Sequence, residues 1–124
     1  MLPLTLLVGY DGSESAQRAL DRAATLTGYG SLLIVAAVAS DERGLEHARD
    51  LLDAAERRLL LQRVFCQKRE LVGKPADELT SLAAEVDADL IVVGNGKTAL
   101  QRLFLGSVST ELVHNAPCDV LVAR

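Results

Sequence analysis

Aromatic side chains are scarce in this sequence. Its 124 residues include two Phe, two Tyr and no Trp, so the core has to be built mainly from Leu, Val, Ile and Ala. Cysteine is equally rare: Cys66 and Cys118 belong to no CxxC or Cys/His cluster, which argues against a zinc or other metal site. Both lie in apolar stretches, and we expect them to be two small buried hydrophobic residues.

Excess basic charge and long apolar runs are also missing. The net charge is −4, which argues against a nucleic-acid-binding surface built on basic excess. No apolar run approaches the roughly 18 residues that a membrane span requires, and Met1-Leu2-Pro3 lacks the basic start of a signal peptide. We therefore expect a soluble cytoplasmic protein that binds neither nucleic acid nor a membrane.

What the sequence does contain is apolar material for one good core. Hydrophobic residues make up 49% of the chain, and the length predicts a single domain over residues 1–124. The apolar runs at 4–8, 32–38 and 90–93 are continuous, which is typical of strands covered on both faces in a parallel sheet. Residues 64–72 are more polar and predict an edge strand, and Asp119–Ala123 predicts a fifth strand.

Between these runs, apolar residues recur at helical spacing. Ser13 is a predicted N-cap for the first helix, and a second helix is predicted from about 43 to 61 with a solvated charged face. Pro75 suits the first position of a third helix, and Gly106-Ser107 opens a fourth. Strands alternating with helices indicate an α/β fold: an open five-stranded parallel sheet with helices on both faces.

The segment 89–109 carries the strongest functional signal. An apolar run ends at Gly94, a polar loop opens with Gly94-Asn95-Gly96, and Gly106-Ser107 starts a helix. A strand, a glycine turn and a helix N-terminus in succession make an anion site, to which Lys97 and Arg102 would add charge. We predict a bound nucleotide here; the alternative is an ordinary loop whose glycines serve only turn geometry.

Two enzyme readings of the loops can be set aside. Gly96-Lys97-Thr98 is no P-loop, because the glycine required five residues before Gly96 is replaced by Ile91. Asp11 is followed two positions on by Ser13, where a phosphatase-type aspartyl nucleophile would have a second acidic residue. Asp11 is instead predicted to accept hydrogen bonds from a ligand or to steady the facing loop, or to be a turn-forming residue only. No catalytic residue is predicted.

The position of Asp11 suggests where the site lies. In open parallel sheets, ligands bind beyond the carboxyl ends of the strands, at the point where the strand order reverses. If the first and fourth strands are neighbours there, Asp11 and the loop after Gly94 face each other.

Five segments in order resemble the universal stress protein family. They are VGYDGS at 8–13, GKPA at 73–76, ADLIVVG at 88–94, LGSVS at 105–109 and NAPCDVLV at 115–122. The resemblance implies a Rossmann-like sheet with strand order 3-2-1-4-5. The family's nucleotide-binding branch has G-x-x-G, nine residues, then G-S/T; here nine residues separate Gly96 from Gly106, and Ser107 follows. One residue separates Gly94 from Gly96, where the family pattern has two. The other parts of the pattern match and favour the ATP-binding branch.

The resemblance also implies roles for individual residues. Asp11 would lie near the ribose or phosphates, Ala37 or Val38 would line the adenine pocket, and Val93 and Gly94 would sit under the ribose. The phosphates would be held by Gly96, Gly106, Ser107, Val108 and Ser109. Lys97 is added to this set on its charge alone.

As a family member, the chain would bind ATP, with or without Mg²⁺, and serve as a regulatory module of the stress response. Hydrolysis of ATP would be weak, because no general base is evident beyond Asp11. A homodimer is implied through the terminal strand Asp119–Ala123. The alternative function is a nucleotide-free interaction domain of the same fold that dimerises and binds a protein partner.

Overall fold

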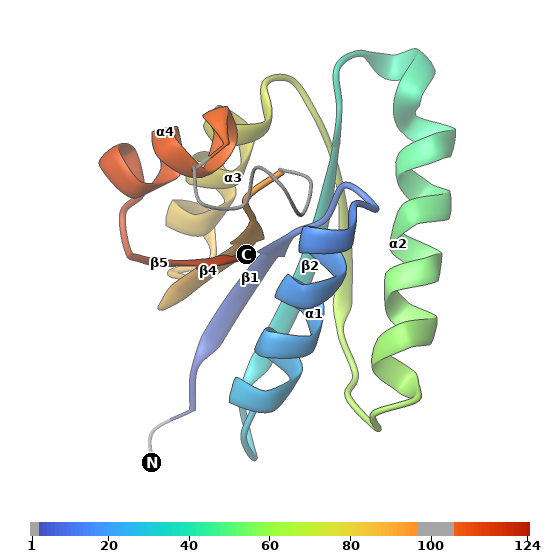
Figure 1. Ribbon diagram of the computed structural model, residues 1–124, viewed down its shortest axis with the longest axis vertical. Helices are drawn as coiled ribbons and strands as arrows, with labels where there is room; N and C mark the ends of the chain where they lie inside the picture. The colour runs from blue at the N-terminus through green and yellow to red at the C-terminus, as the bar shows by residue number, and fades with distance from the viewer. Residues whose placement is uncertain (1–2, 97–105) are drawn as a thin grey trace.

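A computed structural model describes residues 3–96 and 106–124 of the chain. The strands in this part are β1 (Thr5–Gly9), β2 (Leu32–Ala39), β3 (Gln67–Val72), β4 (Leu90–Gly94) and β5 (Asp119–Ala123). The helices are α1 (Glu14–Leu26), α2 (Leu45–Leu60), α3 (Pro75–Glu85) and α4 (Ser107–Asn115), with a short 3₁₀ turn, η1 (Glu42–Gly44), before α2. Figure 1 shows the path of the chain through these elements.

All five strands form one parallel sheet in the order β3-β2-β1-β4-β5. β1 lies at its centre, paired with β2 on one side and with β4 on the other. The strand order implied by the family resemblance is therefore confirmed, and so is the prediction that β3 is an edge strand. Its alternating exposed and half-buried residues fit a position covered on one face only.

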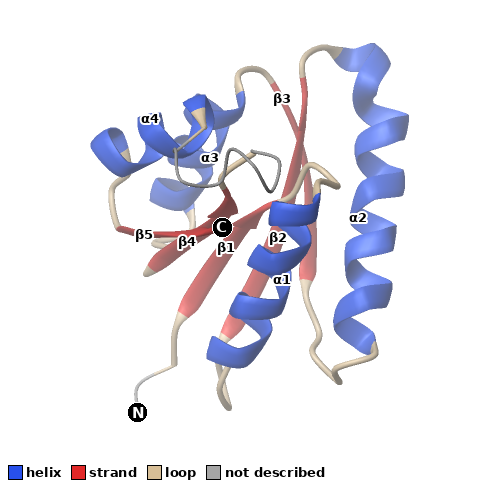
Figure 2. Cartoon of the chain, viewed as in Figure 1, coloured by secondary structure: helices blue, strands red, loops and turns tan. Residues whose placement is uncertain are grey.

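Helices cover both faces of the sheet, as the alternation of elements predicted (Figure 2). α1 and α2 enclose a core cluster on one face that includes Leu6, Leu20 and Leu52. α3 and α4 enclose a second cluster on the other face, which includes Ile91 and Leu112. Apart from Tyr10 in the first cluster, aliphatic residues and alanine fill both clusters, in agreement with the scarcity of aromatics.

The boundary of β3 differs from the prediction. The strand begins at Gln67 and not at residue 64, because Val64 belongs to the turn that ends α2: its N–H donates to the carbonyl of Leu59 at 3.0 Å. Arg63 in the same turn has a φ of 59°, a left-handed conformation that stops both helix and strand. The apolar pattern alone could not place this turn.

The charged face of α2 is more than a solvated surface. Arg49 of this face bonds both carboxylate oxygens of Glu70 on β3, at 2.8 and 3.2 Å. Lys68 of β3 reaches Asp53 and Glu56 of α2, each at 3.1 Å. The charges predicted to be simply solvated therefore join the helix to the edge strand.

The prediction that both cysteines are buried was wrong. Cys66 and Cys118 are free and half-buried. The burial is still enough to raise the pKa of each thiol above its usual range, which keeps both thiols protonated at neutral pH. Cys66 lies just before the exposed start of β3 and Cys118 just before β5. Each therefore stands at the rim of a core cluster.

Membrane-spanning helices are not found in the part of the chain that the structure describes.

Candidate functional site

The site lies where the strand order reverses. β1 and β4 are neighbours, with Val8 opposite Val92 and Gly9 opposite Val93. The two loops that follow these strands therefore emerge side by side at the carboxyl edge of the sheet. Asp11 and the segment from Asn95 to Gly96 line one hollow, which confirms that Asp11 faces the glycine loop.

A hollow of about 260 Å³ opens between this edge and helix α2. Its walls are mainly apolar and come from β1, β2, β4 and all four helices α1 to α4. The residues that line it are Gly9, Tyr10, Asp11, Ser13, Ala16, Ala36, Val38, His47, Leu51, Leu79, Val93, Gly94 and Val108. Pockets that hold flat organic groups have this mixture of aliphatic walls and a few polar side chains.

A smaller and more polar hollow of about 180 Å³ adjoins the first one. Asp11 and Val108 line both, so the two form one continuous site. The smaller hollow is otherwise lined by Asn95, Gly96, Gly106, Ser107 and Ser109. The first turn of α4 thus borders it, and helix N-termini present unbonded N–H groups and a partial positive charge to anions.

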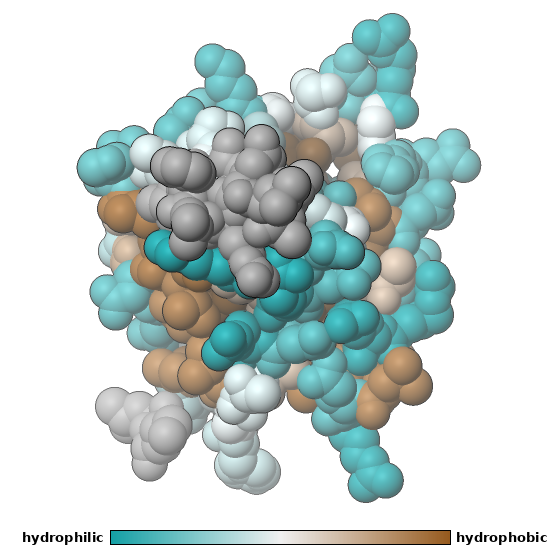
Figure 3. Space-filling view, viewed as in Figure 1, coloured by the Kyte–Doolittle hydropathy of each residue, from teal (hydrophilic) through white to brown (hydrophobic). Residues whose placement is uncertain are grey.

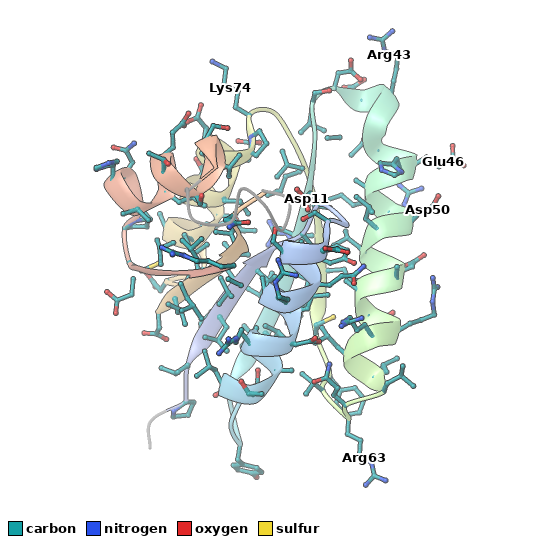
Figure 4. All side chains as sticks on the ribbon, viewed as in Figure 1. Asp11, Arg43, Glu46, Asp50, Arg63 and Lys74 are labelled. Atoms are coloured by element: carbon teal, nitrogen blue, oxygen red, sulfur yellow. The ribbon has the colours of Figure 1, made fainter. Side chains whose placement is uncertain are left out.

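The N-terminus of α1 organises the loop after β1. An Asp11 carboxylate oxygen, Oδ1, accepts from the N–H of Ser13 at 2.9 Å, and the Ser13 hydroxyl accepts from the N–H of Ala16 at 3.1 Å. Ser13 is therefore the N-cap of α1, as predicted. Asp11 lines both hollows, and Figure 4 shows it beside the N-terminal end of α1.

Ser15 ties the two loops together. Its hydroxyl accepts from the N–H of Gly96 at 3.1 Å and lies 3.3 Å from the Ser13 hydroxyl. Ser15 is only 1% exposed. One short chain of hydrogen bonds therefore runs from the loop after β1, through α1, to the loop after β4.

Two glycines are needed because backbone passes directly over them. A Cβ on Gly94 would lie 2.3 Å from the Ser15 hydroxyl oxygen and 2.6 Å from the Ala16 nitrogen. A Cβ on Gly106 would lie 2.2 Å from the carbonyl oxygen of Asn95. The sequence analysis expected Gly94 near a bound ribose and Gly106 among the groups that hold phosphates; in the structure, both glycines also leave room for other parts of the chain.

Gly96 differs from both. Its φ is +69°, and among the described residues beyond its chain neighbours no atom lies within 4 Å of the position that a Cβ would take. The left-handed φ explains why glycine suits the position.

Most of the predicted site residues come together in the two hollows. Those that line them are Asp11, Val38, Val93, Gly94, Gly96, Gly106, Ser107, Val108 and Ser109. Ala37 does not line either hollow: it is 1% exposed and belongs to the core cluster under α1 and α2. Lys97 and Arg102 lie outside the described residues.

Several lining residues escaped the sequence analysis. Ala36 takes the place given to Ala37, because residues 36 and 38 share one face of β2 whereas 37 points to the other. His47 and Leu51 come from α2, four residues apart and so on one side of the helix. The sequence shows that residues 36 and 38 share one face of a strand and that residues 47 and 51 share one side of a helix. It does not show which face or side meets the site, because that depends on how the elements pack.

Burial and charge set the character of the site. Tyr10 is 7% exposed, and this burial raises the pKa of its phenol, so the group stays neutral at physiological pH. Figure 4 shows Glu46 and Asp50 projecting from the outer side of α2, away from the sheet. Among the described residues, Asp11 is then the carboxylate that a ligand in both hollows would meet.

The sequence and the structure both resemble known proteins. The model of the Universal stress protein family matches residues 4–124. Universal stress protein Rv1636 of Mycobacterium tuberculosis strain H37Rv is 36% identical over 139 aligned residues, which cover 97% of this chain and 95% of the relative. A universal stress protein of Thermus aquaticus is 34% identical, with 97% and 98% of the two chains covered.

Solved structures agree with these relatives. The crystal structure of a universal stress protein in complex with cAMP has a TM-score of 0.80 and 33% identity, and the match covers 98% of this chain and 97% of that one. The crystal structure of Rv1636 gives a TM-score of 0.67 at 35% identity, with 100% and 98% covered.

Proposed function

The chain belongs to the universal stress protein family, and on that premise we propose that it binds adenine nucleotides, ATP included, as a regulatory module of the cytoplasmic stress response. The observation that carries the proposal is the double hollow at the β1/β4 switch point. An apolar hollow and a polar one share Asp11 and Val108, and a nucleotide has the same two-part character: an apolar base and a charged phosphate joined by a sugar.

The residues present fit such a ligand. Val38, Leu51 and Leu79 give the larger hollow flat aliphatic walls suited to a purine. The N–H groups of Ser107, Val108 and Ser109 open α4 and have no acceptor within the helix, so they suit a phosphate. A related protein of known structure binds cAMP, which supports an adenine nucleotide as the ligand class.

Binding rather than turnover is the proposed activity. Hydrolysis of a phosphoanhydride needs a group that activates water, and within the described part of the site Asp11 is the carboxylate available for this. Mg²⁺ would accompany a triphosphate as its counterion. Among the described residues, no three His, Cys, Asp or Glu side chains come together as a metal site. With Asp11 as the candidate base, we propose that any hydrolysis is slow.

A Ser107→Glu variant tests the proposal without disturbing the fold. Ser107 is the exposed first residue of α4, where a carboxylate stabilises the helix but repels a phosphate. We expect wild type to bind ATP, AMP or cAMP in calorimetric titrations, and Ser107→Glu to weaken binding by about tenfold or more. The matched control is Ser81→Glu, which adds the same charge at an exposed position of α3.

Failure of wild type to bind any of the three nucleotides at millimolar concentration would contradict the proposal. It would favour the alternative, a nucleotide-free interaction domain of the same family. Equal binding by Ser107→Glu and wild type would place the phosphates elsewhere.

We also propose a homodimer through β5. This strand is at an edge of the sheet, and its outer N–H and C=O groups are not used by β4. Leu121 and Val122 on it are half-buried, and Figure 3 shows apolar surface gathered on the side of the molecule where β4 and β5 lie. An apolar edge strand is the kind of surface that pairs with a second copy.

A further inference from the structure

The one backbone donor of Gly96 is already engaged inside the protein. Its N–H donates to the Ser15 hydroxyl at 3.1 Å, and that hydroxyl is almost completely buried. Buried polar groups keep their partners, because an unsatisfied one is costly. In this arrangement the Gly96 N–H faces α1 and is not offered to a phosphate.

The Ser15 hydroxyl has little freedom to move away. It lies against the α-carbon of Gly94, so closely that a Cβ there would be 2.3 Å from it. It also lies 3.3 Å from the Ser13 hydroxyl, which is itself the cap of α1. Ser15 is therefore a fixed anchor, whereas a Cβ on Gly96 would meet no atom of the described residues within 4 Å beyond its chain neighbours.

With Gly96 engaged, the described donors of the smaller hollow are concentrated at the start of α4. The same hollow is also lined by Asp11, whose carboxylate forms no ion pair among the described residues. Repulsion between this carboxylate and a ligand grows with the number of phosphate charges. Both features favour a ligand with a single phosphate group.

We propose that Ser15 is a specificity-determining residue: by holding the Gly96 N–H, it makes the site favour adenine nucleotides with one phosphate, such as AMP, over ATP. The inference rests on the proposed function. The inference extends that function by ranking the nucleotides by affinity and by naming the residue that sets this ranking.

Titrations with AMP and ATP, each with and without Mg²⁺, test the ranking in wild type and in Ser15→Ala. We expect wild type to bind AMP more tightly. In Ser15→Ala the Gly96 N–H is free to turn to a second phosphate, and the ratio of ATP to AMP affinity rises by about tenfold, the worth of one hydrogen bond to a charged group. Wild type that prefers ATP, or a variant that weakens both ligands equally, would overturn the inference.

Ser31→Ala is the matched control. The Ser31 hydroxyl also accepts from a backbone N–H at 3.1 Å, that of Leu4, but it lies beyond the lining of either hollow. This variant should keep the wild-type ratio. Ser15→Cys, nearly isosteric and a weaker acceptor, should give a ratio between wild type and Ser15→Ala, and it replaces the alanine variant should that one not fold.

A measurement without ligand separates this inference from the proposed function. Hydrogen exchange at the Gly96 amide, followed by NMR, should be slow in wild type, faster in Ser15→Ala and unchanged in Ser31→Ala. Equal rates in wild type and Ser15→Ala would overturn the anchor even if nucleotides bind. A changed rate in a protein that binds no nucleotide would refute the proposed function, and the ligand ranking with it.

Discussion

At the residue scale, Gly94 shows how closely the end of β4 is packed against α1. The Cβ of an alanine there would overlap the Ser15 hydroxyl and also backbone atoms of Ser15 and Ala16. Backbone cannot swing aside as a long side chain can. We expect Gly94→Ala to lower the free energy of unfolding by more than about 2 kcal/mol, measured by urea denaturation.

Gly28→Ala is the control for this prediction. The nearest atom to its Cβ would be the Ser31 hydroxyl oxygen at 3.9 Å, an ordinary contact. Its stability should stay within about 0.5 kcal/mol of wild type. A Gly94→Ala protein as stable as Gly28→Ala would show that the contact between β4 and α1 is loose.

At the scale of elements, α1 and α2 are joined by an ion pair. Arg58 bonds both carboxylate oxygens of Asp21, at 3.0 and 2.8 Å. The hydrogen bond from Arg58 holds the pKa of the Asp21 carboxyl below its usual range. Both side chains are 42% exposed, so solvent screens the pair and its contribution to stability is about 0.5 kcal/mol.

The sign of the pH dependence follows from that lowered pKa. A carboxyl with a lower pKa in the folded state stabilises the protein above its unfolded pKa of about 3.9 and loses that contribution as the pH falls through the folded value. We expect Asp21→Asn to be about 0.5 kcal/mol less stable than wild type at pH 7. The two proteins should converge as the pH falls below the ordinary carboxyl range.

Urea denaturation at a series of pH values checks this convergence. Asp50→Asn is the control, since Asp50 projects from the outer side of α2 (Figure 4) and forms no ion pair in the described structure. A stability difference for Asp21→Asn that stays constant with pH would mean that the pair does not act through its charge.

At the scale of the whole molecule, the two edges of the sheet should behave differently. Lys68 and Glu70 of β3 are tied to α2 by ion pairs, and Arg69 is tied to Glu85 of α3, whereas β5 offers mainly apolar residues. We expect Leu121→Lys, on β5, to shift the protein from dimer to monomer by placing charges at the interface. Sedimentation equilibrium over a range of protein concentrations measures the shift.

Val72→Lys introduces the same charge at the end of the opposite edge strand, where the residue is 39% exposed. It should leave the dimer intact. A wild-type protein that is monomeric throughout the concentration range, or equal dissociation by both variants, would refute pairing through β5.

The sequence by itself determined the sheet and its helices. Continuous apolar runs, the Ser13 cap and Pro75 at the first position of α3 depend on local periodicity and backbone preference, and these properties can be read along the chain. The sequence also predicted that Asp11 and the glycine loop lie close together, because the carboxyl ends of neighbouring parallel strands meet at one edge of the sheet.

Only the tertiary structure decided what the individual groups at that edge do. Ala36 and not Ala37 faces the site, because the pairing of β2 in the sheet fixes which side each residue takes. His47 and Leu51 reach the site because α2 packs beside it. Gly94 and Gly106 lack a Cβ that would collide with backbone atoms of neighbouring segments. The N–H of Gly96 donates to the hydroxyl of Ser15, 81 residues away in the chain. Contacts between such distant segments depend on the packing of whole elements, and no local pattern encodes them.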